Sequence, residues 1–146
     1  RDVALAVQRA IGDGAEEFWG QKPIATLPGL AVVPRLAFLI GRLLDAGLVT
    51  GGPVFRAMVP VYEPDGASPA LCLSTRLGAL RHHRADAHRA AWAAAGLTAA
   101  EIQSLPQGPA RQAIEDATNR RDAPLYTALS MDEQRDLLAS LGALQG

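Results

Sequence analysis

The stretch from residue 71 to residue 95 constrains the fold of this chain more than any other. It has the sequence LCLSTRLGALRHHRADAHRAAWAAA, is rich in leucine and alanine, and holds all three histidines of the 146-residue chain. Leucine and alanine have high helix propensity, and a glycine such as Gly96 commonly ends a helix. We therefore expect one long helix that ends at Gly96, with the rest of the chain organised around it.

A projection of this helix at 100° per residue separates an apolar face from a polar one. The apolar face, which we expect to be buried, holds Leu73, Leu77, Leu80, Ala87, Ala91 and Ala95. Arg84 and His88 fall inside the same face. The opposite side of the helix holds His82, Asp86 and Arg89. The two edges of the apolar face hold His83 and Trp92.

A guanidinium on a buried face needs a partner, because desolvation of an ion costs several kcal/mol. One alternative is an Arg–Glu or Arg–Asp pair that ties this helix to another, with His88 a hydrogen-bonded core histidine. The other is a polar pocket in which Arg84 and His88 form the floor and Trp92 and His83 the walls. With Asp86 added, these residues are the candidate ligand-binding set.

Composition favours a mainly α fold and a single helical domain over residues 1–146. Alanine and leucine dominate, aromatic residues make up 5% of the chain, and the length suffices for a hydrophobic core. The formal net charge is −1, and acidic and basic residues are balanced in both halves, so no basic tail or stripe indicates nucleic acid.

The single cysteine, Cys72, cannot form an internal disulfide, which is typical of a reducing compartment. We expect a cytoplasmic protein without a signal peptide. The longest apolar run, residues 27–44, is interrupted by Pro34, Arg35 and Arg42, so we expect no membrane-spanning helix.

Local signals in the first half of the chain predict three helices and one weakly extended run before the long helix. Residues 2–11 have helical spacing, Gly12 is a candidate stop, and residues 13–16 have the spacing of a capping box for a second short helix. Pro34 is well placed to begin the next helix, and Gly47 to end it. The run VFRAMVPVYE alternates weakly and predicts an edge strand or an irregular segment, because it contains Pro60.

The second half carries two further capping boxes, at residues 98–101 and 130–133. Between them Pro109 can begin a helix that presents Glu115 and Asp116 as candidate acid partners. The last helix should present Leu138, Leu141 and Leu144 inward.

Metal and nucleophile motifs are weak in this sequence. No two histidines have the His-x-x-x-His spacing of a helical metal site, and neither a Gly-x-Ser-x-Gly elbow nor a glycine-rich phosphate loop occurs. We therefore predict no metal, no cofactor and no defined catalytic set. General base chemistry by His88 beside Arg84 is retained as the basis of an enzyme alternative.

The run His83-Arg84-Ala85-Asp86-Ala87-His88, followed by Ala90-Ala91-Trp92 and Ala95-Gly96-Leu97, resembles the His-Arg-Gly-Asp-Gly-His signature of a family of actinobacterial helical proteins. These proteins are often described as helix-turn-helix or MarR-related. The match includes Arg84, Asp86 and His88, whereas alanine replaces both family glycines. Residues 114–125 and 129–133 also resemble the last two helices of MarR-type regulators, which implies a homodimer. Together these stretches cover about a third of the chain.

The chain departs from MarR-type regulators where their DNA-reading head should be. Only the residues LTAAEIQSLPQG lie between Gly96 and the C-terminal helices, which leaves no room for a recognition helix and a basic wing. The run RLAFLIGRLLDAGLVT resembles the end of a winged-helix recognition helix, but it offers only Arg35 and Arg42 to phosphates. The fold expectation therefore includes a degenerate winged helix-turn-helix.

These features predict a small-molecule-binding protein of MarR-like ancestry: a ligand sensor, a sequestering protein or a pathway accessory. Arg84 would supply charge, His88 a hydrogen bond and Trp92 a stacking surface. The first alternative is a DNA-binding transcriptional regulator with a disordered wing, which uses Arg35 and Arg42. The second is a small enzyme with His88 as general base.

Overall fold

The computed structural model describes residues 2–20 and 30–144 of the chain, and these residues form a single, mainly α domain around one long helix. No strand occurs within the described ranges, so the predicted fold class and long central helix are confirmed. In chain order the elements are α1 (Asp2–Gly20), the 3-10 turn η2 (Leu30–Val32), α2 (Val33–Thr50), α3 (Pro53–Met58), α4 (Pro69–Ala94), α5 (Ala99–Ser104), α6 (Pro109–Tyr126) and α7 (Met131–Ala143).

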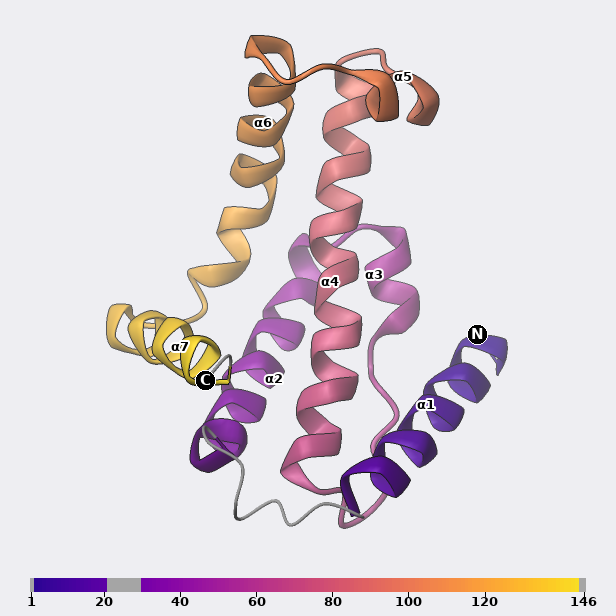
Figure 1. Cartoon of the computed structure of the whole chain (residues 1–146), viewed down its shortest axis with the longest axis vertical. Helices are drawn as coiled ribbons and strands as arrows, with labels where there is room; N and C mark the ends of the chain where they lie inside the picture. The colour runs from indigo at the N-terminus through magenta and orange to yellow at the C-terminus, as the bar shows by residue number, and fades with distance from the viewer. Residues whose placement is uncertain (1, 21–29, 145–146) are drawn as a thin grey trace.

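Helix α4 is the axis of the domain (Figure 1). Its N-terminal half packs against α1, α2 and α3, and its C-terminal half runs beside α6. Helix α5 connects α4 to α6 at the far end, while α7 packs across α2. The two ends of α4 therefore have different surroundings, and its middle lies where α2, α3 and α6 meet.

Helix boundaries follow the local capping signals in the second half of the chain. The hydroxyls of Thr98 and Ser130 accept hydrogen bonds from the backbone N–H of Glu101 and Glu133, and both predicted capping boxes are confirmed. Gly96 follows the end of α4 with φ of 71°, a left-handed conformation that favours glycine. Pro109 begins α6, as predicted.

Three predictions for the first half are wrong. Helix α1 continues through Gly12 to Gly20 as one helix, so the predicted break and second start do not occur. Gly47 lies inside α2 rather than after it, because it makes room for Phe55: an added Cβ would lie 2.6 Å from Phe55 Cζ. The predicted edge strand does not form: residues 54–58 of the run VFRAMVPVYE belong to α3, which Pro53 starts, whereas residues 59–63 are irregular, which was the other alternative.

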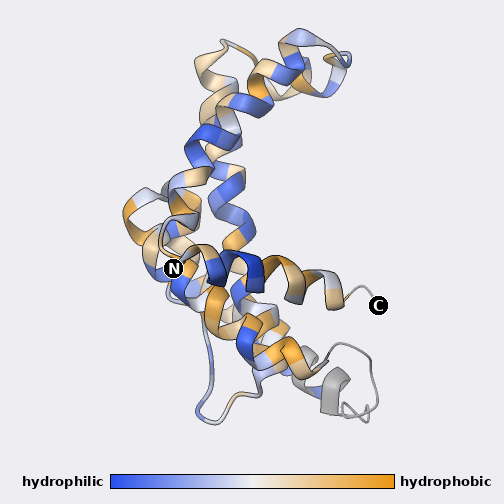
Figure 2. Ribbon diagram, turned by 90° about the vertical axis from the view of Figure 1, so that its left-hand side faces the viewer, coloured by the Kyte–Doolittle hydropathy of each residue, from blue (hydrophilic) through white to orange (hydrophobic). Residues whose placement is uncertain are grey.

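The largest hydrophobic cluster lies between α2, the N-terminal half of α4 and the C-terminal helices. Its fully buried members include Leu36, Leu39 and Leu43 of α2, which pack with Leu125 and Leu137. Figure 2 shows the hydrophobic stretches of α2 in this lower part, and more hydrophilic stretches along the arm that α4 and α6 form. A separate small cluster of Ala91, Ile102 and Ile114 holds the tip of that arm together.

Helix α7 buries only part of its predicted apolar face. Leu137 is buried and Leu141 is half-buried, whereas Leu138 is 71% exposed, so its predicted inward orientation is wrong. Among the described helices, none has the length and apolar character that a membrane crossing requires.

Candidate functional site: a polar relay behind a pocket

The middle of α4 carries a buried histidine that joins three helices. His83 is 2% exposed, its Nδ1 lies 2.7 Å from Asp122 Oδ1 on α6, and its Nε2 lies 2.8 Å from Thr50 Oγ1 at the end of α2. Phe55 of α3 packs its ring edge-on against the imidazole, with ring centroids 5.3 Å apart. A hydroxyl, an imidazole and a carboxylate therefore stand in one hydrogen-bonded row.

The partners of His83 fix the direction of its hydrogen bonds. An ionised carboxylate only accepts hydrogen bonds, so Nδ1 of His83 carries the proton that it donates to Asp122. In the neutral imidazole the lone pair then lies on Nε2, which accepts the hydrogen bond that the Thr50 hydroxyl donates. Asp122 is buried, with its side chain 6% exposed, and Arg84 Nη1 lies 3.6 Å from its second oxygen. The row thus has a defined polarity from the hydroxyl to the carboxylate.

Asp86, one turn further along α4, holds α3 in place. Its Oδ2 accepts a hydrogen bond from the backbone N–H of Phe55 at 2.8 Å, and Arg89 lies against its Oδ1. Burial by itself raises the pKa of Asp86, but hydrogen bonds from the Phe55 N–H, from Arg89 and from the Val54 N–H outweigh it and hold the pKa below its ordinary value. Asp86 therefore caps a helix distant in sequence, because the N-cap residue of α3, Gly52, has no side chain to cap it.

Gly52 is required by this arrangement. An added Cβ would lie 2.6 Å from both Cβ and Cγ of Asp86, closer than side chains pack. The Gly51-Gly52 pair thus lets the chain turn from α2 into α3 while the Asp86 carboxylate reaches the start of α3.

A pocket of about 260 Å³ opens beside this row. We call it the Thr50 pocket, and it is lined by Thr50, Gly52, Pro53, His83, Asp86, Ala87, Ala90 and Arg121. Its walls come from α2, α3, α4 and α6, and the exposed side chain of Arg121 supplies a positive charge. A concave site with a few convergent polar groups is typical of small-molecule binding, and its volume is near the lower end of the roughly 300–1,000 Å³ common for ligand pockets.

Arg84 does not lie in the predicted buried position. Its side chain is 46% exposed, and its guanidinium donates hydrogen bonds to Asn119 Oδ1 at 3.0 Å and Glu115 Oε2 at 3.3 Å on α6. The prediction of burial is wrong because α4 packs against α6 as well as α2, so its contacts do not follow one stripe. Of the alternative of a buried Arg–Glu or Arg–Asp pair between helices, the structure shows the pair itself, with Glu115 as the partner, but not its burial.

His88 and Trp92 lie together on the same side of the arm. His88 is half-buried and its Nε2 lies 3.2 Å from Glu115 Oε1, so it pairs with the acid that Arg84 also contacts. The Trp92 ring packs against His88 with centroids 4.6 Å apart. Its buried indole N–H is the one buried side-chain polar atom in the described ranges that has no hydrogen-bond partner. Neither residue lines the Thr50 pocket.

His83 and Asp86 are more buried than the helical projection predicts. The projection places His83 on an edge and Asp86 opposite the apolar face, whereas both are buried. The reason is that α3 and the end of α2 cover this side of α4, which local periodicity cannot indicate. Of the predicted ligand-binding set, the structure brings only these two residues to the Thr50 pocket.

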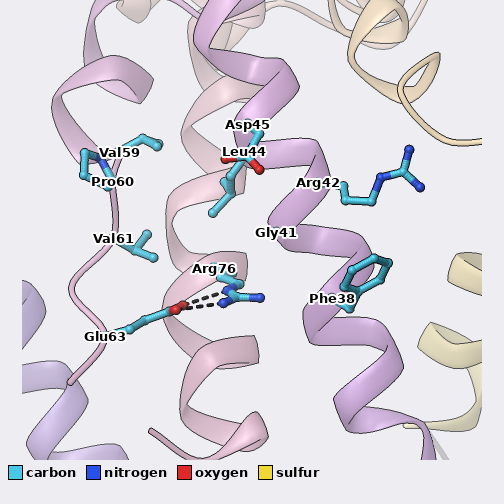
Figure 3. A pocket seen from close by; sticks show the side chains of 10 residues that line it. All are labelled: Phe38, Gly41, Arg42, Leu44, Asp45, Val59, Pro60, Val61, Glu63 and Arg76. Atoms are coloured by element: carbon cyan, nitrogen blue, oxygen red, sulfur yellow. Dashed lines mark hydrogen bonds and ion pairs between the residues drawn. The ribbon is translucent and has the colours of Figure 1, made fainter. Parts of the chain in front are cut away.

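A second pocket, of about 320 Å³, lies between α2, α4 and residues 59–63 (Figure 3). Glu63 and Arg76 form a two-pronged ion pair at its edge, with both N–O distances 2.7 Å, and Arg76 Nη1 also donates to the Ala37 carbonyl at 2.8 Å. An added Cβ on Gly41 would lie 2.9 Å from Arg76 Nη1. This ion pair satisfies its own donors and acceptors, and Arg42 and Asp45 also line the pocket.

The two arginines of the DNA-binding alternative pair with α7. Arg35 Nε lies 2.9 Å from Asp136 Oδ2, and Arg42 contacts Glu133 and the Ala128 carbonyl. Their charge is compensated within the protein. In residues 2–20 and 30–144 no group of three histidine, cysteine, aspartate or glutamate side chains is arranged to hold a metal ion.

Sequence analysis did not identify Thr50, Asp122 or Arg121 as site residues. Thr50 and Asp122 lie 33 and 39 residues from His83, so no local motif connects them. The available signal was that His83 lies at the edge of the apolar face of a helix, where a buried imidazole needs polar partners from elsewhere in the chain. Comparison of the chain with protein-family models, with curated proteins and with solved structures finds no match.

Proposed function

We propose that this chain binds a small polar or anionic molecule in the Thr50 pocket. It would serve in the cytoplasm as a ligand sensor, a sequestering protein or a pathway accessory of MarR-like ancestry. The observation that carries the proposal is the convergence of the Thr50 hydroxyl, the Asp122-backed imidazole of His83 and the cationic Arg121 on one concave surface.

The chemistry of the pocket favours a ligand with a carboxylate or a similar anionic group. Arg121 offers a charge-assisted hydrogen bond, and the Thr50 oxygen, whose proton is donated to His83, can accept one from a protonated group of the ligand. Ala87, Ala90 and Pro53 supply apolar walls that suit a ring or a short hydrocarbon chain. This assignment moves the ligand site from Arg84 and His88 to the other side of α4.

The experiment is a titration of the ¹⁵N-labelled chain with acetate, benzoate and inorganic phosphate, followed by amide chemical shifts. Benzoate should shift the amides of Gly52 and Ala87 in a saturable way. Loss of one charge-assisted hydrogen bond is worth roughly 1.5–3 kcal/mol, so Arg121→Met should weaken binding about tenfold or more. Arg135→Met, which removes an exposed arginine of α7, is the matched control and should leave binding unchanged.

Two outcomes would contradict the proposal. One is the absence of saturable shifts at the pocket with all three probes. The other is a set of shifts confined to Arg84, His88 and Trp92, which would return the site to the arm.

The DNA-binding alternative receives less support, because Arg35 and Arg42 are engaged by acids of α7. A DNA reader must lose affinity steeply as salt increases. Fluorescence anisotropy with a labelled duplex at several salt concentrations tests this, and a steep salt slope would favour the alternative.

A homodimer through the C-terminal helices is part of the proposal. Met131 and Leu138 of α7 are 63% and 71% exposed and offer an apolar surface for a second copy. Sedimentation velocity should give the mass of a dimer, and Leu138→Glu should give the mass of a monomer. A monomeric parent chain would contradict this part.

A further inference from the structure

The row of Thr50, His83 and Asp122 has the order of groups that nucleophilic catalysis uses. A hydroxyl is weakly nucleophilic until a base removes its proton, and a carboxylate behind the base orients the imidazole and stabilises its charged form. We propose that Thr50 is a nucleophile that accepts an acyl group from activated esters of small carboxylic acids in the Thr50 pocket.

The distances along the row are those that proton transfer requires. Thr50 Oγ1 lies 2.8 Å from His83 Nε2, and His83 Nδ1 lies 2.7 Å from Asp122 Oδ1, both within hydrogen-bond reach. The three residues come from α2, α4 and α6, so the row is held by tertiary packing and not by one local turn. Phe55, which is fully buried, further limits the rotation of the imidazole.

Burial increases along the row from the Thr50 hydroxyl to His83 and Asp122, as a nucleophile that must meet its substrate requires. Thr50 is exposed and lines the pocket, whereas the side chains of His83 and Asp122 are 2% and 6% exposed. An ester in the pocket would therefore meet the hydroxyl first, with the base and the acid shielded behind it. A purely structural hydrogen bond would not need its hydroxyl at a pocket wall.

The step balances without a cofactor. Thr50 Oγ1 attacks the carbonyl carbon of the ester while its proton passes to His83 Nε2, and a C–O bond forms. The carbonyl π electrons move to oxygen, and the exposed guanidinium of Arg121 on the same pocket wall can stabilise that negative charge. When the electrons return, the bond to the alcohol oxygen breaks, and His83 gives its proton to that oxygen. The products are acyl-Thr50 and a free alcohol.

The proposal depends on the pocket of the proposed function but has its own covalent readout. Benzoate binding without acylation would overturn only the nucleophile assignment. Acylation of Thr50 without detectable benzoate binding would overturn only the proposed affinity for anions.

The test uses the full chain and p-nitrophenyl acetate. Intact mass and peptide fragmentation should place one acetyl group on Thr50, with release of one equivalent of p-nitrophenolate. Thr50→Val keeps the shape of the side chain without the hydroxyl, and Thr50→Ser keeps the hydroxyl. Acetylation at position 50 should be abolished in Thr50→Val, which has no hydroxyl. Because a positioned base contributes about a hundredfold or more, the rate should fall about a hundredfold in Asp122→Asn, and it should stay within about tenfold in Thr50→Ser.

His88→Gln is the matched control, since His88 is half-buried, outside the row, and a competing site for this reagent. Its rate should equal that of the parent chain. Acetylation found only at histidines outside the row, lysine or the N-terminus would overturn the proposal, as would an unchanged rate in Thr50→Val. A purely structural row would move the melting temperature of Asp122→Asn but would place no acetyl group on Thr50 in the parent chain.

Discussion

Replacement of Asp86 by alanine should lower the free energy of unfolding by about 3 kcal/mol at pH 7. The carboxylate accepts the backbone N–H groups of Phe55 and Val54 at the start of α3, and α3 has no other side-chain cap. A buried N–H left without an acceptor costs about 1–3 kcal/mol. The contact with Arg89 adds less than about 1 kcal/mol, because the Arg89 side chain is 48% exposed.

The pH dependence of this effect has a defined sign. Because the folded-state pKa of Asp86 lies below its ordinary value, its charge contributes stability that is present above the unfolded-state pKa of about 3.9 and is lost as the pH falls through the folded-state pKa. The difference in stability between the parent chain and Asp86→Ala should therefore narrow as the pH falls from 5 toward 3.

Urea denaturation followed by helical circular dichroism measures both effects. Asp132→Ala is the matched control. Like Asp86, Asp132 lies three residues before its arginine partner, but its side chain is 92% exposed, so the free energy of unfolding should change little. A loss below about 1 kcal/mol in Asp86→Ala at pH 7 would refute the capping argument. A difference from the parent chain that did not change between pH 5 and pH 3 would refute the assigned role of the charge.

Four further substitutions test the contacts around the site, each by chemical denaturation, and the last of them also by benzoate titration. Phe55→Ala should lower the free energy of unfolding by about 3–5 kcal/mol, because the ring is fully buried. A loss below about 2 kcal/mol would contradict its place in the core. Gly47→Ala should cost about 1–3 kcal/mol, since its Cβ would meet the Phe55 ring, whereas Gly78→Ala, which meets nothing within 4 Å, should gain about 0.5–1 kcal/mol. Arg84→Met should change stability by less than about 1 kcal/mol and leave benzoate binding intact, because its ion pairs are exposed; lost binding would restore Arg84 to the ligand site.

The sequence predicts the helical elements best where their signals are local. Capping at Thr98 and Ser130 depends on residues three apart, and the structure confirms both. Gly47 misleads because a glycine near a helix end is typical of a cap, yet here it serves close packing against Phe55. Whether such a glycine caps a helix or makes room for a side chain depends here on the contact with Phe55, which follows in the next helix and is not part of the local pattern.

The candidate site is less predictable than the fold for the same reason. Periodicity in α4 assumes one buried face, but three different helices cover different sides of the segment around His83. The burial of Asp86 depends on the backbone of α3, and the partners of His83 come from α2 and α6. The expectation that polar side chains of this helix find partners on other helices holds for Arg84 and His88, which both contact Glu115, but it does not identify the partners of His83.

Helix α4 runs without a break from the base of the domain past His83 to the tip of the arm. At 1.5 Å of rise per residue, Ala94 lies about 16 Å beyond His83, so a tilt of about 5° pivoting there would swing the tip by roughly 1.4 Å. In such a tilt the bundle around the pocket would stay in place, and the arm formed by α4 and α6 would move. A tilt of this size would move α5 relative to the bundle, although no residue of α5 lines the Thr50 pocket.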